Sequence, residues 1–364
     1  MTTIREAKVP VRSAAIIGTV GVPARYGGFE TLAERLAVGL PANELRLTIY
    51  CERAAYPEIQ GHPGFAGHER RFLPIRANGA SSMMHDAVAM LHATFVRRVD
   101  SMLVLGYSGA WMLPVIRCLR PSLRIVTNID GMEWRRDKFS RGTRGLLRIL
   151  EWFACRFSNA IIADNAALVP LVRKIHGVEP AVVAYGGDHT LVPAGRCDIP
   201  SGYVLAIARV EPENNCRMIL EAAVRAGVRL VFVGNWNANA YGRELKATFE
   251  GADGIILIDA VYSLERLAEL RRGAQIYVHG HSVGGTNPSL VEALYHSDRL
   301  LAFDCPFNRA TLENGGAYFG TVDALVALLS DLTSGRIDAE LLVALRARYR
   351  WQSIVNAYRA LLSD

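Results

Sequence analysis

One run of the sequence has residue types that suit the binding of a phosphate. A double glycine is followed closely by Asn287, Pro288 and Ser289. Asn287 is a preferred helix N-cap, and Pro288 fits the first helical position because its missing N–H would be unpaired there anyway. The amides of Ser289 and Leu290 would then be free at the positive end of the helix, which stabilises an anion by roughly 0.3 to 1 kcal/mol.

An acidic side chain follows within reach of such a phosphate. Glu292 lies one turn further on, on the same helical face as Pro288, and helical side chains lean toward the N-terminus. Its carboxylate can therefore accept a hydrogen bond from a hydroxyl of the ligand whose phosphate the amides hold. A nucleoside diphosphate offers both groups at about that separation. The alternative interpretation is a capped surface helix with a solvated Glu292.

The segment from Thr286 to Leu294 resembles the donor-nucleotide segment of retaining glycosyltransferases of the GT-B fold, whose signature is two glutamates with seven residues between them. The resemblance implies that Glu292 is the second glutamate, which binds the nucleotide ribose. The first glutamate contacts hydroxyls of the transferred sugar in that family, and its position is Gly284 here, which is a departure. The other donor-binding residues implied in this segment are Gly285, Thr286, Asn287, Ser289 and Leu290.

A second motif follows an apolar run at Tyr203–Ala208 that is typical of a buried strand. It resembles the second donor motif of the same enzymes, in which an arginine and a lysine hold the diphosphate. Arg209 matches the arginine, and Asn214 stands where the lysine is usual. We expect both residues to bind the donor. Because no Asp-x-Asp metal motif is present, we expect Arg209 and backbone amides to neutralise the diphosphate without a metal ion. No cofactor is expected besides the co-substrate, a dTDP- or UDP-sugar.

A glycine-rich loop also opens the chain. It follows the apolar run Ser13–Gly18 and leads into a helical pattern that continues to Leu40. Its glycine spacing does not fit the dinucleotide-binding fingerprint. The segment resembles the opening of the N-terminal domain of bacterial rhamnosyltransferase-like enzymes, where a Tyr-Gly-Gly-Phe-Glu-Thr run lies near the donor phosphates. Gly27 and Gly28 are therefore expected to let the donor approach the backbone. The alternative is a glycine turn that only closes onto the helix.

Two acids follow the predicted strand Leu123–Asn128 at its carboxyl end. Acids at this place face the crevice of a doubly wound sheet. In the resembled family this position meets the acceptor, so Asp130 and Glu133 are expected to orient the acceptor hydroxyl. Together with Arg209 they are the expected catalytic residues. As ordinary turn and cap acids they would have no such role.

These motifs need elements that bring them together. The 364 residues suit about two domains, and apolar runs of strand length alternate with helical patterns. The expected fold is α/β, with two Rossmann-like doubly wound domains facing a cleft, the GT-B arrangement. The predicted strands are Ser13–Gly18, Leu45–Cys51, Ser101–Gly106, Leu123–Asn128, Ala160–Asp164, Pro180–Tyr185, Tyr203–Ala208, Leu230–Gly234, Gly254–Ile258 and Ala274–Val278.

The expected domain boundaries lie where periodicity stops. Residues 1–188 are expected to form the acceptor-side domain and 189–336 the nucleotide-sugar donor domain. A helix within 337–364 is expected to cross back to the first domain, as the resemblance implies. The linker around Gly186–Pro200 contains glycine and proline and has no periodicity.

The charge is unevenly distributed. From Met1 to Tyr185 there are 24 Lys and Arg against 15 Asp and Glu, whereas the remainder has 17 against 20. A basic half fits either nucleic acid or an anionic membrane, and no nucleic-acid-binding motif accompanies it. Basic and bulky apolar residues interleave over 135–156, which suits a helix at an anionic lipid surface. A core-facing helix with a solvated basic face is the alternative.

Six cysteines without paired spacing and no apolar run of membrane length indicate a cytoplasmic protein. With the basic first half, we expect it to be peripheral at the inner face of the cell membrane.

The resemblance covers nearly the whole chain and implies a glycosyltransferase. The expected reaction moves rhamnose from dTDP-rhamnose, with retention, to a lipid-linked saccharide in bacterial cell-surface polysaccharide synthesis. A transferase that uses a UDP- or GDP-hexose is one alternative. A nucleotide-sugar epimerase of the same fold and a non-catalytic sugar-nucleotide-binding protein are two others.

Overall fold

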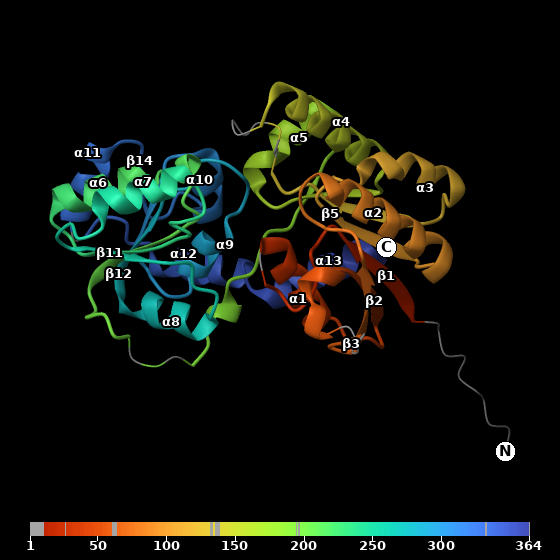
Figure 1. Ribbon diagram of the computed structural model, residues 1–364, viewed down its shortest axis with the longest axis horizontal. Helices are drawn as coiled ribbons and strands as arrows, with labels where there is room; N and C mark the ends of the chain where they lie inside the picture. Colours follow the sequence, from red (N-terminus) through yellow and green to blue (C-terminus); the bar gives the residue numbers. More distant parts are fainter. Residues whose placement is uncertain are drawn as a thin grey trace, which may run out of the picture.

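The computed structural model describes residues 11–25, 27–59, 64–131, 134, 139–193, 195, 197–331 and 333–363. Glu133 lies outside the described residues, as do the first residues of the basic run that follows it, Arg135 to Lys138. Two α/β domains lie side by side, each with a parallel sheet between layers of helices (Figure 1). The first half of the chain forms one domain, and the second half forms the other apart from the last helix.

The sheet of the N-terminal domain has eight strands in the described part of the chain, in the order β3-β4-β2-β1-β5-β6-β7-β8. All neighbouring strands are parallel apart from the antiparallel pair β3 and β4. The central strands are rich in buried Ile, Leu and Val, as expected where helices cover both faces. The strands are β1 Arg12–Ile17, β2 Leu45–Glu52, β3 Gly64–Phe65, β4 His68–Leu73, β5 Ser101–Leu105, β6 Arg124–Asn128, β7 Ala160–Ala163 and β8 Ala181–Val182.

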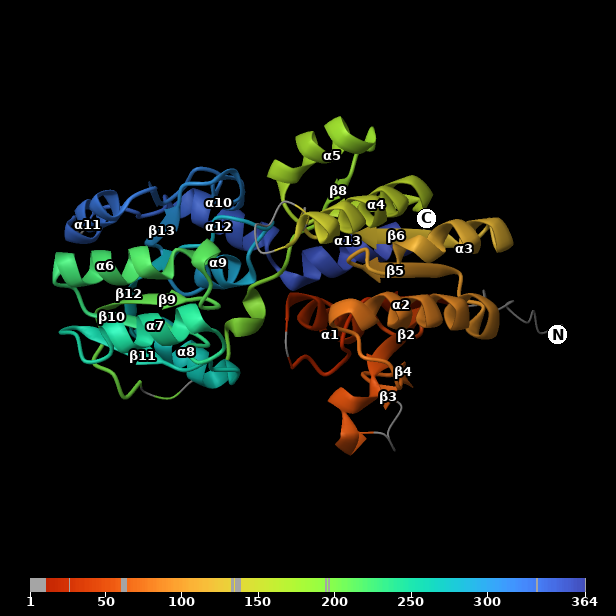
Figure 2. The same cartoon turned by 45° about the horizontal axis from the view of Figure 1, so that its top comes forward.

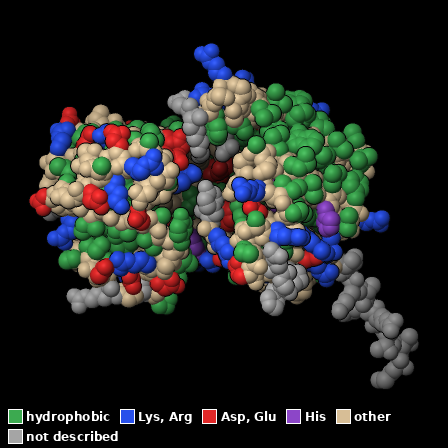
Figure 3. Space-filling view, in the orientation of Figure 1, with side chains coloured by type: hydrophobic (Ala, Val, Ile, Leu, Met, Phe, Trp, Pro, Cys, Tyr) green, Lys and Arg blue, Asp and Glu red, His purple; other side chains and the backbone are tan. Residues whose placement is uncertain are grey.

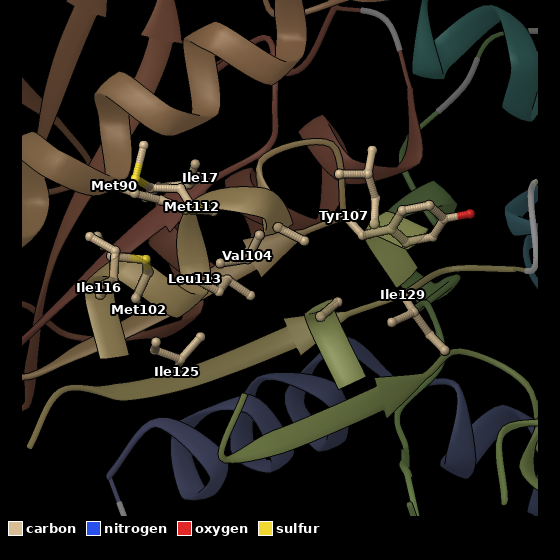
Figure 4. Close-up of a cluster of buried hydrophobic side chains, with 14 of the residues drawn as sticks. Ile17, Met90, Met102, Val104, Tyr107, Met112, Leu113, Ile116, Ile125 and Ile129 are labelled. Atoms are coloured by element: carbon tan, nitrogen blue, oxygen red, sulfur yellow. The ribbon is translucent and has the colours of Figure 1, made fainter. Parts of the chain in front are cut away.

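Helices cover this sheet on two sides. One face packs against α2, α3, α4 and α5, and the other against α1 and the final helix α13. Figure 4 shows the first core, in which Met90, Met112 and Ile116 meet Met102 and Val104 of β5. The helices are α1 Gly28–Gly39, α2 Ser82–Leu91 with a π-helical continuation at His92–Arg97, α3 Leu113–Leu119, α4 Arg141–Phe157 and α5 Val169–His176.

The C-terminal domain has a six-stranded sheet in the described residues, in the order β11-β10-β9-β12-β13-β14, with all neighbours parallel. This is the doubly wound order 3-2-1-4-5-6. The strands are β9 Tyr203–Ile207, β10 Leu230–Val233, β11 Ile255–Ile258, β12 Ala274–His279, β13 Leu300–Phe303 and β14 Ala317–Phe319. The helices are α6 Cys216–Ala226, α7 Ala240–Phe249, α8 Leu264–Gly273, α9 Pro288–Ala293, α10 Pro306–Leu312, α11 Val322–Ser330 and α12 Ala339–Arg348.

The last helix, α13 at Trp351–Ser363, returns to the N-terminal domain (Figure 2). Its buried side chains join the core that α1 covers, and the Asn128 amide donates to the Tyr358 hydroxyl at 2.7 Å. The helix expected over Ile337–Leu362 is therefore two helices, separated at Tyr349 and Arg350. The separation lets α12 stay in the core of the C-terminal domain while α13 enters the other core.

The expectation of two doubly wound α/β domains is confirmed. Each of the ten predicted strands contains an observed strand or overlaps one closely. Four strands were not predicted: β3, β4, β13 and β14. No helix in the described residues is both long enough and apolar enough to cross a membrane.

Tyr358→Phe tests how much the returning helix depends on its buried hydrogen bond. The variant keeps the ring but leaves the buried Asn128 amide without its acceptor, which should lower the free energy of unfolding by about 1 to 3 kcal/mol. Urea unfolding measures this free energy. Tyr262→Phe, which changes an exposed tyrosine, is the matched control. Equal unfolding midpoints for the two variants would contradict the role given to this bond.

Candidate functional site in the cleft between the domains

The carboxyl ends of the two sheets face each other across a cleft. The amide of Thr286, which follows β12, donates to the carboxylate of Asp164, which follows β7, at 3.0 Å. A Cβ on Gly131, after β6, would lie 3.0 Å from the backbone of Gly284, after β12. Figure 3 shows the surface hollowed between the domains, with acidic side chains in the hollow. Ligands of doubly wound sheets bind at this edge of the strands.

On the C-terminal side, the cleft is built at the point where the strand order reverses, between β9 and β12. The loops after these strands are bonded together: the Asn215 amide donates to Gly280 O at 2.8 Å, and the Ser282 hydroxyl donates to Glu213 O at 2.8 Å. Gly280 has no room for a side chain because Asn214 O would lie 2.2 Å from its Cβ. The two predicted donor motifs therefore form one continuous surface.

Arg209 begins the first of these loops with an exposed side chain. Within the described residues its guanidinium makes no hydrogen bond or ion pair, so its charge is available to an anion. Asn214 is different, since its side chain is buried and its amide donates to Arg209 O at 2.8 Å. This bond shapes the turn that presents Arg209. The donor-binding roles of both residues stay predictions.

The second loop leads from Gly285 into α9. Asn287 occupies the N-cap position and Pro288 begins the helix, as predicted, although the Asn287 side chain makes no capping bond. The expectation of a free Leu290 amide is wrong, because that amide donates to Asn287 O at 3.1 Å in a tightened first turn. In the described structure the amides of Gly285, Asn287 and Ser289 have no acceptor. Because α9 has only six residues, its dipole is small, and these loop amides with Arg209 are the main groups for an anion.

Glu292 is not a solvated surface residue. Its side chain is 16 % exposed and forms an ion pair with the buried Arg271 of α8. Burial raises the pKa of the Glu292 carboxyl, and the Arg271 guanidinium opposes that rise. The second carboxylate oxygen lies 3.5 Å from Nε2 of His189. Arg271 and His189 thus fix the orientation of the carboxylate.

The imidazole of His189 is neutral. Burial first, and then the charges of Arg35 and Arg271, lower the pKa of His189 to about 3. Its Nδ1 accepts from the Trp351 indole at 2.9 Å, so the ring proton is on Nε2, facing Glu292. Since Trp351 begins α13, the position of Glu292 is tied to the segment that connects the two domains.

On the N-terminal side, the loop after β1 folds back onto α1. Glu30 accepts from the Val20 amide at 2.9 Å, and a Cβ on Gly27 would lie 2.9 Å from the Glu30 carboxylate. Gly28 lies against the ring of Tyr185, 3.5 Å from where its Cβ would be. The groups that lie nearest to Gly27 and Gly28 are thus protein side chains. Their donor-binding role stays a prediction.

Asp130 lies at the carboxyl end of β6 with a left-handed backbone, φ 54°, and its amide donates to the Asn128 side chain at 2.8 Å. Its carboxyl lies close to that of Asp164, which is buried. Burial, and then the charge of Asp130, raise the pKa of Asp164 well above its usual range. Asp164 was not singled out in the sequence, although it ends a predicted strand just as Asp130 follows one.

A scan against protein-family models finds no match for this chain, and a search of curated proteins finds none either. Solved structures do match. Sucrose-phosphate synthase from Thermosynechococcus elongatus superposes with a TM-score of 0.79 at 13 % identity, over 97 % of this chain and 99 % of that one. The chain has the GT-B fold.

Two further structures with this fold contain nucleotides. HepE from Anabaena in complex with UDP and glucose has a TM-score of 0.73 at 13 % identity, over 97 % of this chain and 100 % of that one. The catalytic domain of starch synthase IV from Arabidopsis thaliana, bound to ADP and acarbose, has a TM-score of 0.68 at 12 % identity, over 98 % of this chain and 99 % of that one. At such identities the likeness is one of fold.

Arg271→Ala tests whether the ion pair beneath the cleft is intact in solution. The variant leaves the Glu292 carboxylate buried without its cation, which should lower the free energy of unfolding by about 3 to 5 kcal/mol. Urea unfolding of the variant is compared with that of Arg272→Ala, at the exposed neighbouring arginine. Equal losses in the two variants would show that Glu292 does not depend on Arg271.

Proposed function

We propose that this chain is a glycosyltransferase that takes a sugar from a nucleotide donor held mainly by the C-terminal domain. One observation carries the proposal: the guanidinium of Arg209 and the amides of Gly285, Asn287 and Ser289, which have no partner within the described residues, lie on two loops that are bonded together at the switch point of the sheet. An anion fits such a surface. The oriented carboxylate of Glu292 supplies the acceptor for a ribose hydroxyl. The nucleotides in HepE and starch synthase IV support the same ligand class.

In this proposal the residues act by stabilising charge. When the bond between the sugar and the diphosphate breaks, negative charge grows on the leaving diphosphate. Arg209 and the loop amides stabilise that charge most in the transition state, so no metal ion is required in this proposal. Asp130, with Glu133, orients the hydroxyl of the acceptor on the opposite side of the cleft. Retention of configuration is part of the proposal through the resemblance to retaining enzymes.

The donor that we propose is dTDP-rhamnose. Thymidine lacks the 2′-hydroxyl, so Glu292 would accept only from the 3′-hydroxyl, whereas a UDP donor would offer two hydroxyls. Gly284, in place of the first glutamate, removes one carboxylate from the sugar-binding side. A deoxysugar such as rhamnose has one hydroxyl fewer to satisfy. A UDP- or GDP-hexose is the second candidate, and the UDP and glucose in HepE favour it.

The acceptor that we propose is a lipid-linked saccharide at the cytoplasmic face of the membrane. Helix α4 supports this proposal because Leu146, Ile149 and Trp152 are 45 %, 54 % and 49 % exposed. Arg141, Arg148 and Arg156 are exposed on the same helix. Its Glu151 is buried and accepts from the Trp134 indole at 2.9 Å, so it adds no surface charge. Figure 3 shows hydrophobic side chains gathered over this part of the N-terminal domain.

A thermal-shift panel with UDP, dTDP, GDP and their sugars tests the donor. A nucleotide present at 100 times its Kd should stabilise the native state by about 2.7 kcal/mol and raise the Tm.

Arg209→Ala should weaken nucleotide binding about 10- to 100-fold and reduce turnover further, since it removes a charge-assisted bond worth about 1.5 to 3 kcal/mol. Arg225→Ala, which affects a surface ion pair with Asp323, is the control.

Turnover assays with the same nucleotide sugars, read together with the Tm, distinguish the other function classes. With donor and acceptor present, a transferase forms a new glycoside. An epimerase would isomerise the donor incubated alone, and a binding protein would raise the Tm without turnover. Unchanged kinetics in Arg209→Ala would refute the role of the guanidinium.

Vesicle co-sedimentation tests the membrane proposal. Binding should rise with the phosphatidylglycerol content of phosphatidylcholine vesicles and fall with salt. Replacing both Ile149 and Trp152 by Ser should reduce the bound fraction about 10-fold, because their exposed apolar area enters the interface. Val343→Ser, at an exposed valine of α12, is the control. Binding that ignores the anionic lipid, or equal binding by all variants, would contradict the proposal.

A further inference from the structure

Two consecutive residues of the N-terminal domain hold the donor loop of the other domain. The Thr286 amide donates to the Asp164 carboxylate at 3.0 Å, and the Thr286 hydroxyl donates to Asp164 O at 2.5 Å. The Asn165 amide donates to Thr286 Oγ1 and Thr311 Oγ1, both at 3.1 Å, and to Phe307 O at 3.2 Å. The side chains of Asp164, Asn165, Thr286 and Thr311 are all buried. Buried bonds of this kind cost free energy when they are broken.

The loop fits this place only because it contains glycine. A Cβ on Gly285 would lie 1.8 Å from Asp164 Oδ1, so the backbone of Gly285 rests directly on the carboxyl. Gly131 and Gly284 also approach each other from the two sides of the cleft, since a Cβ on Gly131 would lie 3.0 Å from Gly284. The conformation of the donor loop is therefore set by the opposite domain. Within the described residues, the amides of Gly285 and Asn287, on either side of Thr286 in that loop, have no acceptor.

The carboxyl of Asp164 also lies beside Asp130, the acid that is proposed to orient the acceptor hydroxyl. It lies close to the Asp130 carboxyl, and two neighbouring carboxyls resist ionising together. The phenols of Tyr185, after β8, and Tyr358, on α13, face the same pair, and Glu30 acts on Tyr185. Burial first, and then the charge of Asp130, raise the pKa of Asp164 well above the usual carboxyl range, so ionisation of both members of the pair is opposed.

We propose that Asp164 is a positioning residue that sets both halves of the site from one carboxyl: it fixes the donor loop through Thr286, and it lies against the Asp130 carboxyl and holds it toward the acceptor. The inference rests on the proposed glycosyl transfer. In the closed cleft, donor and acceptor are placed relative to each other by this single side chain. Losing it should weaken donor binding somewhat, through the loop amides, and should lower turnover more, because Arg209 and Glu292 belong to the C-terminal domain alone and still bind the donor.

The kinetics of two substitutions at Asp164 show whether this residue positions the donor loop and Asp130 or only stabilises the fold. Asp164→Ala removes both contacts and should reduce kcat about 100-fold, the effect of a misplacement of about 1 Å, while the Kd for nucleotide changes less than about 5-fold. Asp164→Asn keeps an acceptor for Thr286 and a donor for Asp130, so it should restore kcat to within about 10-fold of the wild type. Asp253→Asn, at an exposed acid of the C-terminal domain, is the control.

The pH profile gives a second readout that a merely structural role would not move. In the wild type, turnover should fall at alkaline pH when Asp164 loses its proton and two adjacent charges repel. Asp164→Asn has no such proton, so its alkaline limb should be absent or displaced. A wild-type kcat in Asp164→Ala, or an unchanged alkaline limb in Asp164→Asn, would overturn the proposal.

Hydrogen exchange tests the contact without any activity, so failure of the proposed function can be told apart from failure of this inference. Amides of the 284–290 segment should exchange faster in ligand-free Asp164→Ala than in the wild type or Asp253→Asn, since the loop loses its partner. Equal exchange in all three proteins would show that Asp164 does not order the loop. Faster exchange in a protein that transfers no sugar would leave the contact established and overturn the functional part.

Discussion

The structure depends on one buried contact between its domains, the bond from the Thr286 amide to the carboxyl of Asp164. It brings the carboxyl ends of two separate parallel sheets face to face. The returning helix α13 joins the domains a second time, since its Trp351 contacts His189 and its Tyr358 bonds Asn128. The cleft lies between these two connections. Among the described residues, each one assigned to the donor or the acceptor lies on a loop or helix that borders the cleft or is tied to one of the connections.

Most of the fold could be predicted from the sequence because the strands of a parallel sheet are buried on both faces. Runs such as Ala14 to Ile17 and Leu230 to Val233 are continuously apolar and are followed by glycine. The strand at His68–Leu73 has charged side chains within it and could not be recognised by that rule. The break between α12 and α13 contains neither proline nor glycine. It arises because the two helices belong to different cores, which only the tertiary structure reveals.

The candidate site was predictable where local rules apply. The N-cap at Asn287 and the acid after β6 followed from capping and from the polarity of parallel sheets. Asp164 obeys the same rule and could have been found with it. The ion pair between Arg271 and Glu292 joins residues on separate elements, so no periodicity or spacing indicates it. The bond from the Leu290 amide to Asn287 O depends on the tight first turn of a very short helix.

The central claim is that the cleft binds a pyrophosphate-linked nucleoside between Arg209, the loop amides and Glu292. Crystal structures of the chain grown with UDP and with dTDP test it most directly. The account predicts diphosphate oxygens within hydrogen-bonding distance of the Arg209 guanidinium and of the Gly285 or Asn287 amide, with the ribose 3′-hydroxyl at the Glu292 carboxylate. A nucleotide bound elsewhere, or one in the cleft whose diphosphate and ribose touch neither Arg209 nor Glu292, would contradict it.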